Sequence, residues 1–186
     1  MIGGMARRVS SPVLVGRGAE VAQLRAAFER AAAGQPAVVL VAGEAGVGKT
    51  RLVTGLLGEA GQLGAVVLTG GCMDVGEGEL AYAPIVEALR PLAAVMGPEE
   101  LERVLGGAHG ELARLVPELG PPAGGEAADA ALAPTRLFEL LLGVLHRLAE
   151  RRPVLLVVED LHWADQSTRD LLGFLARTCV AGSPWC

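Results

Sequence analysis

The sequence predicts an α/β domain built on a parallel sheet, and three observations predict it. Runs dominated by valine and leucine at residues 37–43, 65–71 and 154–158 are typical of strands buried on both faces of such a sheet. Apolar residues recur at helical spacing between these runs. Each predicted strand is followed by a predicted helix, and this alternation indicates parallel strands joined by helical crossovers.

The N-terminal part predicts a helix, a strand, a glycine-rich turn and a second helix. Residues 14–34 form the first helix, because Val21, Leu24 and Phe28 share one face and Gly34 ends the pattern. Pro36 then precedes the strand at 37–43. Helical spacing resumes over 50–61, directly after the glycine-rich turn.

The middle of the chain predicts the second strand and three helices. The strand over 65–71 leads through a polar turn to a helix over 83–96, with Pro84 in its first turn. Residues 98–106 and 109–119 predict two short helices. Residues 120–134 have low complexity and predict a flexible surface loop within the domain.

The C-terminal part predicts a long helix over 135–152, the third strand at 154–158 and a last helix over 164–178 with Asp165 as its N-cap. No strand follows that helix, so we expect a C-terminally truncated sheet. The domain organisation expected is a disordered N-terminus, 1–12, and one partial domain, 13–186.

Composition excludes several classes of protein. The chain has 186 residues, 51% of them apolar, and a formal charge of −5, which argues against a nucleic-acid-binding surface as the main task of this segment. The three cysteines are widely spaced and form no zinc or redox pair. No run reaches the about 18 consecutive apolar residues of a membrane span, and no signal peptide is evident. We therefore expect a soluble protein in the cytoplasm.

Residues 43–50, here called the phosphate loop, read GEAGVGKT and match G-x-x-x-x-G-K-[ST] between a predicted strand and a predicted helix. Glycines let successive backbone N–H groups converge on phosphate oxygens, and the helix start adds its dipole. Lys49, the only lysine beside 15 arginines, offers a compact charge to the β- and γ-phosphates, and Thr50 offers a hydroxyl to Mg²⁺. The alternative is a plain turn that happens to contain a lysine. The expected nucleotide contacts are Gly43, Glu44, Ala45, Gly46, Val47, Gly48, Lys49, Thr50 and Arg51.

Two carboxylates, Glu159 and Asp160, follow the apolar run at 154–158. Ligands of open α/β sheets bind beyond the carboxyl ends of the strands. One carboxylate at this place can hold Mg²⁺ while the other orients or deprotonates an attacking water. We therefore predict Lys49, Glu159 and Asp160 as catalytic residues and Thr50, Glu159 and Asp160 as metal ligands. A helix cap or a solvated loop is the alternative reading of the pair.

Other polar residues favour structural roles. His162 and Trp163 follow the third predicted strand, where an aromatic side chain usually packs against a neighbouring helix. His109 and His146 lie at helical spacing without a partner pattern, and Cys72 is expected to be a small buried side chain.

The chain resembles a known family over about residue 13 to its C-terminus. The phosphate loop, residues 14–24 (LVGRGAEVAQL), 81–92 (AYAPIVEALRPL) and 157–165 (VVEDLHWAD) together resemble the ATPase module of bacterial signal-transduction ATPases with numerous domains, the Orc1-like branch of the AAA-type ATPases. Relatives of this kind occur in large LuxR-type transcriptional regulators. The resemblance implies a P-loop NTPase fold with three layers, and ATP with Mg²⁺ as cofactors.

The resemblance also implies roles for single residues. Val15, Gly16 and Arg17 would lie near the adenine end of the nucleotide, although Arg17 could equally be a surface residue at a helix start. Glu159 stands at the family's metal-binding position and Asp160 at its catalytic position. The usual order of acidic residue types is not kept here, so the division of labour between the two stays open.

The functional expectation is a Mg²⁺-dependent, ATP-binding regulatory module that hydrolyses ATP slowly, because the sensor residue and helical lid of such families are not found in the chain. The alternative is a fragment of a LuxR-type transcriptional regulator in which ATP switches self-association for DNA binding. A nonfunctional truncation is the third possibility. Expected partners are ATP or ADP and further copies of the domain, with no nucleic acid bound by this segment and no membrane.

Overall fold

The computed structural model describes residues 16–73, 81–122 and 134–180. The predicted disordered N-terminus, 1–12, lies outside these residues, and so does 123–133, most of the predicted loop. Val15 also lies outside them. Among the described helices, none carries an apolar stretch long enough to cross a membrane.

Two parallel strands form the sheet. β1 (Val66–Gly71) pairs with β2 (Val154–Glu159) in a register that runs from Val66 opposite Val154 to Gly71 opposite Glu159. The second and third predicted strands are therefore confirmed, and their parallel pairing supports the α/β prediction. Every residue of β2 is half-buried, so the expectation of full burial on both faces is wrong for this strand in the described structure.

The first predicted strand is the main departure from expectation. Residues 37–43 form no strand, and Val38, Val39 and Leu40 are 56%, 50% and 75% exposed. A strand needs the backbone of a neighbour, and neither β1 nor β2 pairs with this segment. The described residues thus hold a two-stranded sheet where three strands were predicted. An apolar run predicts that a segment tends to be buried, but it forms a strand only where its backbone hydrogen-bonds to a neighbouring strand.

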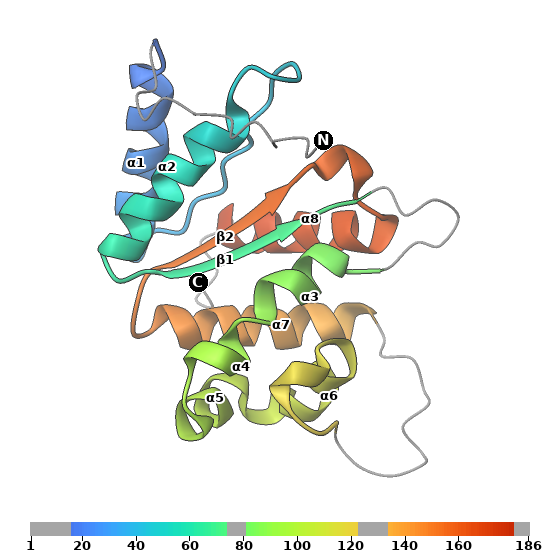
Figure 1. The fold of residues 1–186 in the computed structure, drawn as a ribbon. Coiled ribbons are helices and arrows are strands. Elements are labelled where there is room, and N and C mark those ends of the chain that lie inside the picture. Colours follow the sequence, from blue (N-terminus) through green and yellow to red (C-terminus); the bar gives the residue numbers. More distant parts are fainter. Residues whose placement is uncertain (1–15, 74–80, 123–133, 181–186) are drawn as a thin grey trace, which may run out of the picture.

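Two helices cover one side of the sheet. α1 (Gly18–Ala32) and α2 (Lys49–Gln62) pack against each other, and both contact β2 (Figure 1). Leu24 and Phe28 of α1 and Leu52 of α2 are buried, in agreement with the predicted apolar face of the first helix. This pair positions the start of α2, where the phosphate loop ends.

An ion pair links the two helices. Arg25 of α1 donates to both carboxylate oxygens of Glu59 in α2, at 3.0 and 2.6 Å. The hydrogen bond from Arg25 lowers the pKa of Glu59. Since a lowered pKa stabilises the folded state above the ordinary glutamate range, this contribution is lost as the pH falls through the folded-state pKa.

Replacing Glu59 with glutamine is therefore expected to lower the free energy of unfolding at neutral pH and to lower it less at acidic pH. Urea unfolding midpoints of wild type and Glu59→Gln, measured at neutral and acidic pH, test this. The difference should be small, because both side chains are exposed. A difference that stays constant across the pH range would contradict the assignment.

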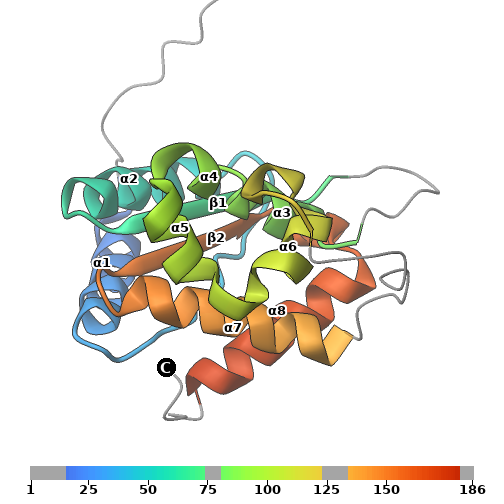
Figure 2. The same cartoon turned by 90° about the horizontal axis from the view of Figure 1, so that it is seen from below.

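The remaining helices are α3 (Ala83–Leu89), α4 (Leu92–Val95), α5 (Pro98–Leu105), α6 (His109–Leu115), α7 (Pro134–Ala149) and α8 (Gln166–Val180). They lie on the other side of the sheet, except α8, which lies behind the strands in the view of Figure 1 and packs against α7 and α3 (Figures 1 and 2). The short 3₁₀ turns η1 (Gly106–Ala108) and η2 (Pro117–Leu119) flank α6, and η4 (Leu161–Trp163) follows β2. The single helix predicted over 83–96 is divided into α3 and α4. Pro91 lies at the division, because it has no N–H to donate to the preceding turn.

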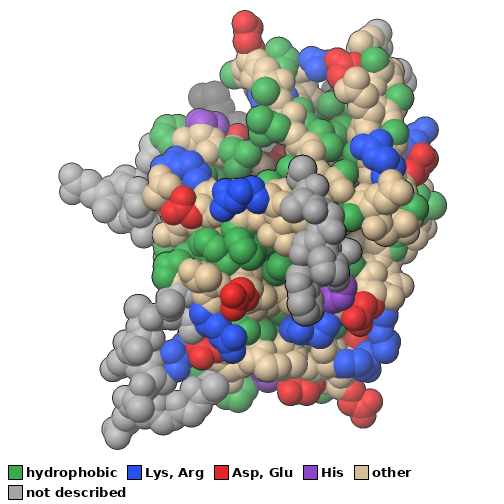
Figure 3. All heavy atoms as spheres, turned by 180° about the vertical axis from the view of Figure 1, so that it is seen from behind, with side chains coloured by type: hydrophobic (Ala, Val, Ile, Leu, Met, Phe, Trp, Pro, Cys, Tyr) green, Lys and Arg blue, Asp and Glu red, His purple; other side chains and the backbone are tan. Residues whose placement is uncertain are grey.

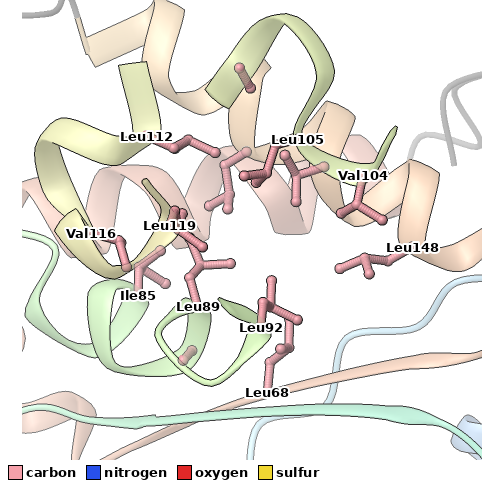
Figure 4. Packing of buried hydrophobic residues seen from close by; sticks show 14 of the residues in the cluster. Leu68, Ile85, Leu89, Leu92, Val104, Leu105, Leu112, Val116, Leu119 and Leu148 are labelled. Carbon is pink, nitrogen blue, oxygen red and sulfur yellow. The ribbon is translucent and has the colours of Figure 1, made fainter. Parts of the chain in front are cut away.

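The hydrophobic core lies between the sheet and these helices (Figure 4). Phe138 of α7 joins two elements, since its ring lies 6.4 Å from that of Tyr82 and 5.6 Å from that of Phe174. On the face seen in Figure 3, acidic and basic side chains are interspersed near the lower edge. The least exposed large core residues include Leu68, Leu92, Leu105, Leu112, Leu141, Leu171, Val116 and Val144.

Arg147, a residue of the long helix α7, binds the C-terminal end of α5. Its guanidinium donates to the backbone carbonyls of Val104 and Leu105 in a partly buried contact. These carbonyls belong to the last turn of α5, where the chain passes from the α-helix into η1.

Replacing Arg147 with alanine should lower the free energy of unfolding by about 1–3 kcal/mol, since two carbonyls lose their donor. Chemical denaturation measures the change. Arg151→Ala is the matched control on an exposed residue just beyond α7, and it should have little effect. Equal losses in both variants would contradict this role of Arg147.

Candidate functional site

The phosphate loop curls because glycines occupy its left-handed positions. Gly46 and Gly48 have φ angles of 80° and 91°, a region that residues with a Cβ rarely adopt. Gly48 is the N-cap of α2, which begins at Lys49. The sequence-predicted order of glycine-rich loop and helix is thus present, although an exposed segment and no strand leads into the loop.

Lys49 folds its side chain back over the loop. Its Nζ donates to the carbonyl oxygens of Gly43 and Glu44, both at 2.9 Å, and the residue is half-buried. The ammonium therefore lies against the loop backbone. An incoming phosphate oxygen can replace either carbonyl as its partner, because all of these acceptors bind the same N–H donors.

The start of α2 suits an anion. No side chain caps this helix end, and no acidic residue lies in its first turn. The first backbone N–H groups of a helix have no intrahelical partner and carry the positive end of its dipole. Thr50, the second residue of α2, is exposed, so its hydroxyl is accessible from this side. Arg51, the third residue, is half-buried.

The acidic pair lies where β2 ends. Glu159 is the last residue of the strand and is half-buried, whereas Asp160 is exposed. Asp160 has a φ of 54°, which is uncommon for a residue with a side chain and turns the chain sharply. Its carbonyl accepts a bond of 2.9 Å from the Trp163 backbone N–H, which closes η4.

Figure 1 shows β2 ending toward the side of the molecule on which the phosphate loop lies. The structure records no salt bridge from Glu159 or Asp160 to a described basic side chain. Within the described residues, no group of three or more His, Cys, Asp or Glu side chains is arranged to hold a metal ion by itself.

Arg17 contacts the phosphate loop directly. Its Nη2 donates to the Val47 carbonyl at 2.8 Å, and its Nη1 lies 3.4 Å from Glu20 Oε1. Gly16, with a φ of 77°, precedes it. Arg17 is half-buried at the start of α1 and also contacts the loop, so both readings of its role that the sequence left open stay predictions.

Three other predictions can be compared with the structure. Trp163 is 48% exposed, so packing against a neighbouring helix is wrong; its ring lies 5.0 Å from His162. The N-cap role of Asp165 is confirmed, because its Oδ1 accepts the Thr168 backbone N–H at 2.9 Å and its Oδ2 accepts the Thr168 hydroxyl. Cys72 is buried as expected, and burial raises the pKa of its thiol.

His109 has the structural role that its helical position suggests. One ring nitrogen lies 2.9 Å from Glu102 Oε2 and the other 3.0 Å from the Leu119 carbonyl. Sequence reasoning missed Glu87, whose carboxylate accepts the Gly71 backbone N–H at 2.8 Å at the end of β1. The position of Glu87 in a predicted helix is the only signal in the sequence, and that position does not reveal Gly71 as its hydrogen-bond partner.

Comparison with known proteins agrees with this geometry. A family model described as the AAA ATPase domain matches residues 13–181, which include the phosphate loop and the acidic pair. The chain belongs to the AAA ATPase domain family. This AAA ATPase domain is therefore a nucleotide-binding module of the P-loop class, and ATP is the nucleotide that the family description implies.

The chain is also similar to a longer protein. An uncharacterized protein of Rhizobium meliloti (strain 1021) is 30% identical over 193 residues, covering 91% of this chain and 18% of the relative. The chain thus spans about a fifth of the length of that relative. No solved structure matches the chain.

Proposed function

We propose that this AAA ATPase domain is a cytoplasmic module that binds ATP with Mg²⁺ and hydrolyses it slowly. The observation that carries the proposal is the curled phosphate loop with the Lys49 ammonium held 2.9 Å from two of its carbonyls. The Lys49 ammonium and the uncapped start of α2 both place positive charge at this loop. A triphosphate is the ligand that matches this arrangement.

The residues present fit a triphosphate. Loop N–H groups and the start of α2 would bind phosphate oxygens, and the Lys49 ammonium would exchange the carbonyls of Gly43 and Glu44 for the β- and γ-phosphates. The binding free energy should therefore depend mainly on the phosphate chain.

The residues also fit Mg²⁺, a hard cation that prefers oxygen ligands and usually takes one or two carboxylates together with substrate phosphates. Thr50, Glu159 and Asp160 supply a hydroxyl and two carboxylates of this kind. Bound there, the ion would neutralise charge on the phosphate oxygens. The lack of a self-sufficient metal cluster in the described residues suits an ion that arrives with the nucleotide.

We propose slow turnover because fast phosphoryl transfer needs a second cationic side chain, in addition to the loop lysine, that contacts the transferred phosphoryl group. Arg17, the arginine that lies on the loop, is directed at the Val47 carbonyl. Either Glu159 or Asp160 would hold the attacking water. Replacing each residue separately shows which of the two has this role.

Calorimetric titration of the purified chain with ATP, with and without Mg²⁺, tests the proposal. Binding should be tighter with Mg²⁺, and turnover should stay below about 1 per second, the low end for enzymes. Glu159→Gln and Asp160→Asn should separate Mg²⁺ dependence from hydrolysis. A chain that binds no ATP under either condition would contradict the proposal.

A second candidate function follows from the length of the Rhizobium meliloti relative. Because this chain corresponds to 18% of that protein, the domain could work inside a larger regulator, of the LuxR type, in which ATP switches self-association for DNA binding. Sedimentation of the full-length protein with ATP, with ADP and without nucleotide tests this. A mass that does not depend on nucleotide would contradict it.

A further inference from the structure

Arg17 joins two parts of the chain that lie 30 residues apart. It is the N-cap residue of α1, and its guanidinium donates to the carbonyl of Val47 inside the phosphate loop. Glu20 lies on the other side of the same guanidinium, 3.4 Å from Nη1. The side chain is only 32% exposed, so this fork is held between the loop and the first turn of α1.

The direction of the Val47 carbonyl determines the direction of the Gly48 N–H, because both belong to the same planar peptide. In a trans peptide the C=O and N–H bonds point to opposite sides, so a carbonyl held by Arg17 directs the Gly48 N–H away from Arg17. Gly46 and Gly48, on either side, have positive φ angles and permit this orientation. The contact thus selects one orientation for a peptide that glycines leave free to rotate.

Lys49 acts on the loop in the same way at its other end. By holding the carbonyls of Gly43 and Glu44, it directs the N–H groups of the following residues away from the ammonium. Two cations therefore orient the peptides of one loop. Lys49 is bonded to carbonyls that phosphate oxygens would replace, whereas Arg17 has Glu20 as a second partner.

We propose that Arg17 is a positioning residue for phosphate binding, which keeps the Val47–Gly48 peptide oriented so that the Gly48 N–H faces the phosphates. The inference rests on the proposed function. It differs from the role that the family resemblance implies for Arg17, a place near the adenine. Positioning predicts dependence on the phosphate chain, and an adenine contact predicts dependence on the base.

The chain offers a matched control. Arg25, eight residues further along the chain in α1, also joins α1 to the segment after the loop, but it binds Glu59 near the far end of α2. Arg25→Ala removes an arginine contact between α1 and α2 and leaves the loop carbonyls untouched. It separates an effect on the loop from a general loosening of α1.

The experiment measures the dissociation constants of ATP and of inorganic tripolyphosphate, both with Mg²⁺, by calorimetry. Arg17→Ala should weaken both ligands by about tenfold, the range of one hydrogen bond to a charged group. Arg17→Lys should restore part of the affinity, because it keeps a donor, and Arg25→Ala should bind both ligands as wild type does. Thermal unfolding of each variant confirms that it is folded. If Arg17→Ala does not fold, Arg17→Gln takes its place.

Three results would overturn the inference. A loss for ATP alone would assign Arg17 to the base, an equal loss in Arg25→Ala would assign it to general stability, and unchanged affinities would leave it no role in binding. Each of these requires that the wild type binds. A wild type that binds neither ligand would instead contradict the proposed function itself.

Discussion

Replacing Lys49 with alanine is expected to weaken ATP binding by about 30- to 700-fold, which corresponds to about 2–4 kcal/mol. The ammonium would lose its phosphate contacts, and the carbonyls of Gly43 and Glu44 would lose their donor in the free protein. Calorimetric titration with ATP and Mg²⁺ measures the change. Because Lys49 lies at the start of α2 and outside the main hydrophobic core, thermal unfolding without nucleotide should change little.

Lys49→Arg is the informative companion variant. It keeps the charge but replaces a compact ammonium by a wide, planar group that fits a tight loop poorly. Its affinity should fall between those of wild type and Lys49→Ala. Equal ATP affinity in wild type and Lys49→Ala would mean that the phosphate loop is not part of the ATP-binding site.

Replacing Gly70 with alanine is expected to have the largest effect on folding. A Cβ at this position would overlap the carbonyl oxygen of Pro84 and lie 2.6 Å from its carbonyl carbon. Since the obstacle is backbone of α3 and no flexible side chain, β1 and α3 must move apart. Extra atoms in a packed interior typically cost about 1–3 kcal/mol, and a clash with backbone should reach or exceed the upper value.

Gly71→Ala provides the control one residue further along β1. The nearest atom to its added Cβ is Glu87 Oε2 at 3.9 Å, an ordinary contact, so this variant should remain close to wild type. Urea denaturation of both variants gives the two free energies of unfolding. Similar values for Gly70→Ala and Gly71→Ala would mean that α3 does not approach β1 as closely as the structure has it.

Much of the fold could be predicted because local patterns decide it. The valine-rich runs of β1 and β2, the helical spacing of α7 and the capping residue Asp165 all depend on neighbours in sequence. The Pro91 break between α3 and α4 was missed, although a proline inside a helical pattern is a recognisable stop signal.

The residues that sequence reasoning misplaced depend on distant partners. Segment 37–43 has the composition of a strand, yet it lacks a paired neighbour among the described residues. Trp163 is 48% exposed, and the ring contact recorded for it is with its neighbour His162. Glu87 and Arg17 gained roles only when the fold brought backbone atoms from other segments to them.

The sequence by itself determined which chemistry to expect of this domain. The spacing of glycines, Lys49 and Thr50 predicts a phosphate-binding turn, because backbone freedom and charge at fixed positions are local properties. Only the tertiary structure decided which groups orient that turn. Arg17 reaches Val47 because α1 packs beside α2, and contacts between segments so far apart follow from packing that no local pattern encodes.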